Sequence, residues 1–197
     1  IMIIIIIIII YDICSLHMYT SNTLINLISW YMKSEIGDLN KNNVVFKVIG
    51  KRESLPIQIC ELIDHAQKIT SKNTGLKLNI ALNYGGKSDF LSAVKNIIYD
   101  LEKGLITKEL INEDTIKNHL LSKDVSDIDL LIRTSGEARI SNFLLWQLCY
   151  SEMYFTDVLW PDFNEKELEK AINFYSMRDR RFGTSDNNNL KTGPFNL

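Results

Sequence analysis

Residues 129–137 have the sequence DLLIRTSGE, in which a short apolar strand leads directly into a polar loop. Residues 76–86, LKLNIALNYGG, have the same form and end in a glycine turn. Helical patterns lie between and around these strands, so strands and helices alternate along the chain. This alternation predicts an α/β fold with a mostly parallel central sheet flanked by helices. In such sheets ligands bind beyond the carboxyl ends of the strands, where both loops lie.

The remaining elements are predicted from the period of the apolar residues and from glycine and asparagine breaks. Strands are expected at residues 44–49, 76–82, 129–132 and 153–155. Helices are expected at residues 21–40, 57–69, 88–102, 112–121, 142–150 and 165–178.

The N-terminus is unusual because eight consecutive isoleucines, Ile3 to Ile10, follow Ile1 and Met2. A β-branched apolar run of this kind favours a buried strand. It lacks the basic region and the small-residue cleavage site of a signal peptide. The alternative is a low-complexity stretch that is not native sequence. Because the chain does not begin with methionine, a truncated or misread start is favoured.

The composition suits one globular domain, since 46% of the 197 residues are hydrophobic and 23% are charged. The formal net charge is −2, so no global basic field indicates a nucleic-acid partner. The three cysteines, Cys14, Cys60 and Cys149, form no CxxC pair, and the three histidines have no metal-ligand spacing. The sequence therefore supports neither a zinc site nor a disulfide framework, and a reducing compartment fits.

The loop after residue 132 combines two arginines, Arg133 and Arg139, with several hydroxyl side chains. Arginine forks match phosphate oxygens bidentately, and Gly136 lets the backbone approach a ligand closely. A helix is expected to start next, with free N–H groups and a positive dipole end. The loop therefore predicts a phosphate or diphosphate site. The alternative is a solvated loop with surface arginines.

Two further positions have both a functional and a structural interpretation. Glu152 lies between an apolar helix pattern and an apolar strand pattern, and a carboxylate there is suited to Mg²⁺ together with substrate phosphates. Its alternative role is that of a structural partner for a nearby arginine. The basic cluster of Arg178, Arg180 and Arg181 closes the last predicted helix, where basic residues are favoured in any protein.

These segments, in this order, resemble the cis-prenyltransferase family, which includes undecaprenyl and dehydrodolichyl diphosphate synthases. The most specific match is the long run from Asp129 through RISNFLLWQL to YFTDVLWPDF at residues 154–163. Residues 180–183, RRFG, resemble the C-terminal motif of the family. Upstream, residues 42–50 and 73–86 also match. The likeness covers about residues 20 to 183.

Members of this family condense isopentenyl diphosphate onto an allylic diphosphate, such as farnesyl diphosphate, with cis geometry and Mg²⁺. The resemblance implies that isopentenyl diphosphate is bound by Arg133, Arg139, Ile140 and Ser141. It implies that Glu152 is a magnesium ligand. Arginines and Mg²⁺ stabilise the charge that develops when an allylic diphosphate ionises.

The resemblance also implies a dimer, either a homodimer or a heterodimer with a related subunit. Arg181 and Gly183 would belong to the motif that completes a site across this dimer. Trp160 and the expected helix around residues 144–146 would support the site and the subunit contact. The product is a lipid, so peripheral membrane association is compatible with a chain that has no transmembrane segment.

The chain departs from the family at its N-terminal end. The family motif there places an Asp before a glycine-rich turn and an Arg-Trp pair, and no such Asp-Gly-Asn-Gly-Arg-Trp run occurs in the 197 residues. Asp12 does not replace that aspartate, because its spacing is wrong. The part of the site that holds the allylic diphosphate and one magnesium ligand is therefore expected to be missing.

Two explanations compete for this departure. In the first, which we favour, the sequence is a fragment or a misread gene model of an active transferase. In the second, the chain is a non-catalytic partner subunit of a heteromeric enzyme. Known partner subunits tend to lose the Arg-Thr-Ser-Gly-Glu site, which is intact at residues 133–137.

The resulting expectations concern domain organisation and location. Residues 1–19 are expected to be an atypical segment, residues 20–183 the C-terminal two-thirds of a cis-prenyltransferase domain, and residues 184–197 a disordered polar tail. The expected location is cytoplasmic or loosely membrane-associated, at the endoplasmic reticulum if the source is eukaryotic.

Overall fold

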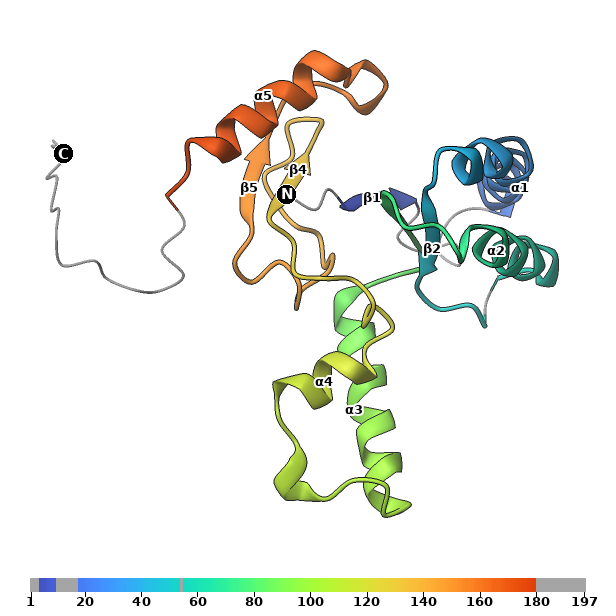
Figure 1. Cartoon of the computed structure of the whole chain (residues 1–197), viewed down its shortest axis with the longest axis vertical. Coiled ribbons are helices and arrows are strands. Elements are labelled where there is room, and N and C mark those ends of the chain that lie inside the picture. Colours follow the sequence, from blue (N-terminus) through green and yellow to red (C-terminus); the bar gives the residue numbers. More distant parts are fainter. Residues whose placement is uncertain (1–3, 10–17, 54, 180–197) are drawn as a thin grey trace, which may run out of the picture. The chain divides into compact units, whose positions relative to one another are not determined.

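The computed structural model describes residues 4–9, 18–53 and 55–179, with side chains from residue 26 onward (Figure 1). Its elements, in chain order, are β1 (Ile4–Ile9), α1 (Met18–Lys41), β2 (Val45–Ile49), α2 (Ile57–Thr70), β3 (Lys77–Leu82), α3 (Gly86–Glu102), the 3-10 helix η1 (Lys108–Leu110), α4 (Glu113–His119), β4 (Leu130–Arg133), β5 (Glu152–Phe155), the 3-10 helix η2 (Trp160–Asp162) and α5 (Glu165–Ser176). The chain divides into two compact units. The first unit comprises Ile1–Asp127 with Ser141–Gln147, and the second comprises Ile128–Ile140 with Leu148–Leu197.

The predicted α/β fold with parallel strands is confirmed, and each unit holds one sheet. The first unit contains three strands in the order β1-β3-β2, all parallel, and the second contains the parallel pair β4-β5. The isoleucine run forms β1 as predicted, in register with β3 from Ile4 opposite Lys77 to Ile9 opposite Leu82. β3 is thus the central strand of its sheet, and Ala81 and Leu82 at its end are buried.

The apolar core of the first unit lies between the sheet and the helices α1 and α2. Leu55, Ile59, Ile63 and Leu82 form a buried cluster, and partly buried side chains of α1 and β2 pack against it. Figure 1 shows α1 and α2 side by side next to β2, in line with their contacts. Apolar residues four apart, such as Ile59 and Ile63, therefore give α2 the face that the helical period predicted.

Polar side chains close the outer edge of β2. The outward N–H groups of Phe46 and Val48 donate to Thr70 Oγ1 at 3.1 Å and to Gln67 Oε1 at 3.0 Å. Asn73 Nδ2 donates to the carbonyl of Val44 at 2.7 Å. These three polar residues recur every third position along α2 and just beyond it. They bind the outward N–H groups of Phe46 and Val48 and the carbonyl of Val44, so side chains satisfy part of the open edge of β2.

A histidine joins α3 to α4. His119 Nε2 lies 2.9 Å from Asp100 Oδ2, and its Nδ1 lies 2.6 Å from the carbonyl oxygen of Thr115. Both partners only accept hydrogen bonds, so the ring satisfies both when both nitrogens carry protons. The bond to Asp100, followed by the bond to Thr115, raises the pKa of His119 above 6.5.

We predict that the α3–α4 pair loses stability as the pH rises above about 6.5. A folded-state pKa that is raised above the unfolded value contributes stability below the unfolded pKa, and this stability is lost as the pH rises through the folded pKa. Urea unfolding between pH 5.5 and 8.5 measures the effect. His119→Gln is expected to reduce the change of the unfolding free energy with pH over this range. The same pH dependence in the variant and the wild type would contradict the stabilising role of protonated His119.

The helix predicted for residues 142–150 is wrong. The segment forms turns, and Ser141, Asn142 and Leu144 have φ values of +47°, +60° and +39°, which a right-handed helix excludes. The segment is apolar because Phe143, Leu144 and Leu148 are buried. Hydrogen bonds to residues far away in the sequence hold it in place instead of its own backbone ladder.

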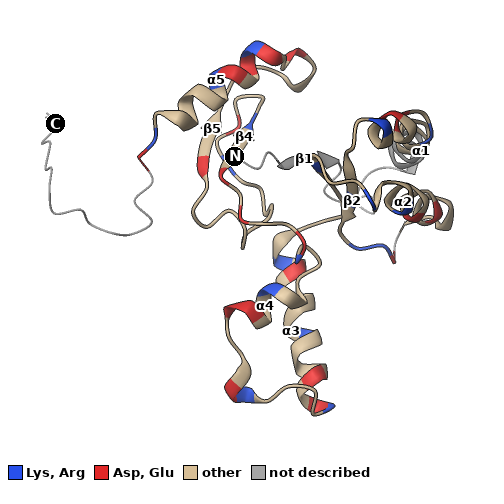
Figure 2. Ribbon diagram, viewed as in Figure 1, with Lys and Arg blue, Asp and Glu red and all other residues tan. Residues whose placement is uncertain are grey.

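The other predicted elements are confirmed with small shifts of their ends. The predicted helix 21–40 is longer, since α1 spans Met18–Lys41, and the predicted helix 165–178 is shorter, since α5 spans Glu165–Ser176. None of the described helices is both long and apolar enough to cross a membrane. Acidic and basic side chains are interspersed along the described helices (Figure 2).

Candidate functional site

Arg133 ends strand β4, at the position where the sequence predicted a diphosphate contact. It lies opposite Phe155 in the parallel pair with β5, and its carbonyl oxygen accepts a hydrogen bond of 2.9 Å from Thr156 N–H. The side chain is half-buried. The backbone of Arg133 is therefore fixed by the sheet at the carboxyl end of the strand, where ligands bind in parallel α/β sheets.

The loop after Arg133 is a tight turn, and two of its N–H groups donate hydrogen bonds to the segment that follows β5. Ser135 and Gly136 have φ values of +67° and +69°. Ser135 N–H donates to Val158 O at 2.9 Å and Gly136 N–H donates to Thr156 O at 3.0 Å. No helix follows the loop, so the expected helix N-terminus with free N–H groups is wrong. The N–H groups of Ser135 and Gly136 are therefore already used within the protein and are not available to an anion.

The four described arginines differ in their partners. Arg52 pairs with Asp64 at 2.8 Å, Arg139 pairs with Glu137, and Arg178 pairs with Glu152 at 2.9 Å. Within the described residues, Arg133 makes no ion pair with a carboxylate. A half-buried guanidinium without an acidic partner keeps its donors available for an added anion.

Glu152 begins strand β5 and is held by an arginine. Its Oε2 accepts from Arg178 Nε at 2.9 Å, and its side chain is 20% exposed. In the register of the pair, Glu152 lies opposite Leu130 and Arg133 lies opposite Phe155, so the two are at opposite ends of the sheet. Three residues of strand separate the ends by roughly 10 Å. The structure therefore does not place Glu152 at the strand end that carries Arg133.

The predicted Mg²⁺ site has one candidate protein ligand among the described residues. They contain no group of three or more His, Cys, Asp or Glu side chains that is arranged to hold a metal ion. Mg²⁺ accepts one or two carboxylates when phosphates and waters complete its shell. Glu152 fits that role as a single ligand once its ion pair with Arg178 opens.

The remaining predicted residues are distributed over both units or lie outside the description. Arg139 and Ile140 belong to the second unit and Ser141 to the first. Arg181 and Gly183, with Arg180, lie outside the described residues. Trp160 is 56% exposed in η2, where its ring stacks on that of Phe163 with centroids 6.0 Å apart.

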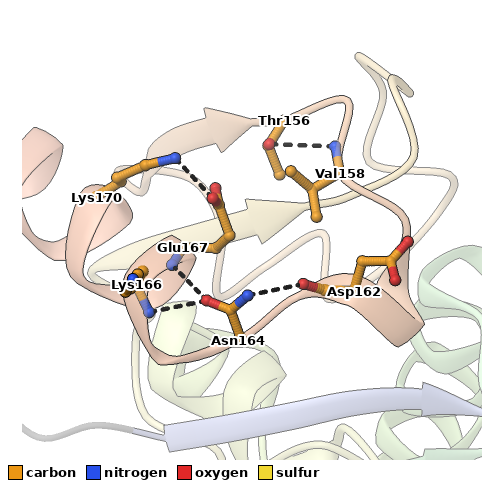
Figure 3. Close-up of polar contacts among 7 residues, drawn as sticks. All are labelled: Thr156, Val158, Asp162, Asn164, Lys166, Glu167 and Lys170. Atoms are coloured by element: carbon orange, nitrogen blue, oxygen red, sulfur yellow. Dashed lines mark hydrogen bonds and ion pairs between the residues drawn. The ribbon is translucent and has the colours of Figure 1, made fainter.

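The chain after β5 is fixed by local polar contacts (Figure 3). Thr156 Oγ1 accepts from Val158 N–H at 3.3 Å. Asn164 Oδ1 caps α5 by accepting from Lys166 N–H at 3.0 Å and Glu167 N–H at 3.4 Å. Lys170 pairs with Glu167 at 2.6 Å on the next turn. These contacts order the segment to which the Ser135 and Gly136 N–H groups bind.

Three polar residues of the first unit were missed by the sequence analysis. Asp89, Ser122 and Gln147 are 1%, 0% and 2% exposed. Ser122 Oγ donates to Asp89 Oδ2 at 2.6 Å and accepts from Gln147 Nε2 at 2.9 Å, and Leu121 N–H donates to Asp89 Oδ1 at 2.6 Å. Of the three, only Gln147 had a signal in the sequence, as the one polar residue in the apolar run FLLWQLC at residues 143–149.

Comparisons with known proteins concern the chain as a whole. Residues 17–183 match the family model described as "Putative undecaprenyl diphosphate synthase". The chain is 44% identical over 164 residues to a ditrans,polycis-undecaprenyl-diphosphate synthase ((2E,6E)-farnesyl-diphosphate specific) of Blochmanniella floridana, covering 83% of this chain and 66% of the relative. It is 48% identical over 160 residues to an isoprenyl transferase of Geobacillus kaustophilus, covering 81% of this chain and 62% of the relative.

A solved structure is similar over most of the chain. Lavandulyl diphosphate synthase from Lavandula x intermedia, in complex with dimethylallyl diphosphate, aligns with a TM-score of 0.82 at 32% identity. The alignment covers 86% of this chain and 74% of that one. The fold and the matched segments together define the class as that of α/β proteins with the prenyltransferase fold.

The chain belongs to the cis-prenyltransferase family, as its matched residues 17–183 establish. It spans 66% and 62% of the lengths of the two relatives named above. The resemblance predicted from the motifs at residues 129–163 and 180–183 is thus confirmed.

Proposed function

We propose that this chain carries the isopentenyl diphosphate half of a cis-prenyltransferase active site. The protein would extend an allylic diphosphate such as farnesyl diphosphate and give a polyprenyl diphosphate. The observation that carries the proposal is Arg133, a half-buried arginine without a carboxylate partner among the described residues, at the carboxyl end of a parallel strand. Membership of the family supports a prenyl diphosphate reaction for this chain.

The proposed chemistry follows from the charges. Diphosphate oxygens accept the parallel N–H bonds of a guanidinium group, so Arg133 would hold isopentenyl diphosphate and fix its direction. Arg139 would also bind the diphosphate, once its ion pair with Glu137 opens. Ile140 and Ser141 would add an apolar contact and a hydroxyl donor. Arg181 and Gly183 would complete the site from the C-terminal motif.

Mg²⁺ is the proposed metal, and Glu152 is its proposed ligand in this chain. When bound, the ion would neutralise charge on the diphosphate leaving group. The ion pair with Arg178 would have to open first, which leaves Arg178 free for phosphate. Assembly as a homodimer or a heterodimer and loose association with a membrane are further parts of this proposal.

We predict that the 197-residue chain alone binds isopentenyl diphosphate but forms no product. Binding is expected because Arg133 is available, whereas turnover needs the Asp-Gly-Asn-Gly-Arg-Trp run that is not among the 197 residues. Equilibrium dialysis with radiolabelled isopentenyl diphosphate measures binding. Incubation with farnesyl diphosphate and Mg²⁺, followed by extraction of lipid product, measures turnover.

The binding assay and the turnover assay test two different claims. Failure to bind isopentenyl diphosphate would contradict the proposed site, while measurable polyprenyl product would contradict only the expected inactivity. The alternative role is that of a non-catalytic partner subunit of a heteromeric cis-prenyltransferase. It predicts that this chain raises the turnover of a catalytic relative when the two are mixed, and that Arg133→Ala leaves this stimulation unchanged.

A further inference from the structure

The N-terminus of α3 is capped by a residue that lies far away in the sequence. The helix begins after Gly85, which offers no side-chain cap. Instead, Gly86 N–H donates to the carbonyl oxygen of Asn142 at 2.7 Å, and Lys87 N–H donates to Asn142 Oδ1 at 2.7 Å. Asn142 therefore satisfies two of the N–H groups that the first turn of a helix leaves unpaired.

This cap holds a segment of unusual backbone conformation. Ser141, Asn142 and Leu144 all have positive φ, at +47°, +60° and +39°. Residues with a β-carbon avoid this region unless their surroundings impose it, and asparagine tolerates it best. The conformation of Ser141 thus depends on the contacts of its neighbour rather than on its own preference.

The approach of the two segments is close enough to exclude a side chain at position 86. A β-carbon on Gly86 would lie 2.6 Å from Leu145 Cγ and 3.1 Å from Asn142 O. Leu144 is fully buried, and Gln147 Nε2 binds Ser122 Oγ at 2.9 Å. The segment 141–147 is therefore fixed to the first unit at both of its ends.

We propose that Asn142 is a positioning residue, which sets the backbone of Ser141 for diphosphate binding by clamping it to the first turn of α3. The inference rests on the proposed function, in which Ser141 contacts isopentenyl diphosphate. All the atoms of the clamp lie in the first unit. Asn142 itself acts through Ser141 and is not assigned a contact with the substrate.

The test compares variants of Asn142 in the 197-residue chain, with the dissociation constant of isopentenyl diphosphate as the readout. Asn142→Ala removes the side-chain acceptor and disfavours positive φ, so binding is expected to weaken about tenfold. Asn142→Asp keeps the acceptor and is expected to bind within about twofold of the wild type. Asn142→Gly keeps the backbone freedom alone and is expected to fall between the two.

A matched control is Asn112→Ala in the same unit. Asn112 caps α4 by accepting from Thr115 N–H at 2.9 Å, so its loss removes a comparable cap elsewhere. Asn112→Ala is expected to lower the thermal midpoint like Asn142→Ala but to leave the dissociation constant unchanged. Equal weakening by both variants would overturn the positioning role, as would full affinity of Asn142→Ala.

The same assay separates this inference from the proposed function. If Arg133→Ala and Ser141→Ala weaken binding while Asn142→Ala does not, only the positioning role is overturned. If the wild-type chain binds but neither Arg133→Ala nor Ser141→Ala has an effect, the proposed site itself is overturned, and the clamp with it. If Asn142→Ala does not fold, the difference between Asn142→Asp and Asn142→Gly decides, and equal affinities overturn the inference.

Discussion

Replacing Asp89 by alanine is expected to lower the free energy of unfolding by about 3 kcal/mol. The side chain is 1% exposed and accepts two hydrogen bonds of 2.6 Å, from Leu121 N–H and Ser122 Oγ. Alanine leaves both donors without an acceptor, and Ser122 is itself fully buried. The destabilisation is expected to reach Gln147 as well, because the side-chain amide of Gln147 donates to Ser122 Oγ at 2.9 Å.

Two further variants make the Asp89 prediction specific. Asp89→Asn keeps an acceptor for Leu121 N–H but turns an amide donor toward Ser122, so a loss of about 1–2 kcal/mol is expected. Glu102→Ala removes an exposed carboxylate from the same helix and is expected to stay within about 0.5 kcal/mol.

Urea unfolding measures the loss of stability, and hydrogen exchange at the Leu121 amide localises it. Equal stabilities of Asp89→Ala and Glu102→Ala would show that the buried network contributes nothing.

The network around Asp89 marks the limit of what the sequence predicts about this fold. The strands β1 and β2 were predictable because each is a short run rich in β-branched residues. Strand β3 was predictable because its polar residues Lys77 and Asn79 alternate with apolar ones and turn residues bound it on both sides. The pairing of Asp89 with Ser122, across 33 positions, has no local signal. The same holds for the segment 142–150, where apolar residues gave a helical pattern and distant hydrogen bonds imposed another backbone.

The candidate site was predictable in its residue types but not in its pairing. The position of Arg133 at the end of a strand followed from the pattern DLLIR, because apolar strands end where polar loops begin. For Glu152 the sequence left a metal ligand and an arginine partner as equal alternatives. The ion pair with Arg178 joins residues 26 positions apart, and only the folded chain brings them to 2.9 Å.

Arg133→Ala is expected to raise the dissociation constant of isopentenyl diphosphate about 50-fold in the 197-residue chain. Arg139 and Arg178 are already bound to Glu137 and Glu152, so a ligand must displace a carboxylate to use them. Arg133 has no such competitor within the described residues. Among the four described arginines it is therefore the one whose donors bind a diphosphate at the smallest cost.

Two variants separate the geometry of the guanidinium group from its charge. Arg133→Lys keeps the charge but loses the planar fork, so a weakening of about tenfold is expected. Arg52→Ala removes the same charge from the first unit, where Arg52 pairs with Asp64 at 2.8 Å, and is expected to leave the affinity unchanged. Protection of the Thr156 amide, which donates to the Arg133 carbonyl at 2.9 Å, verifies that β4 and β5 stay paired. Equal affinities of Arg133→Ala and Arg52→Ala, with that amide still protected, would contradict the role of Arg133, because Arg52 is already paired with Asp64 whereas Arg133 has no carboxylate partner among the described residues.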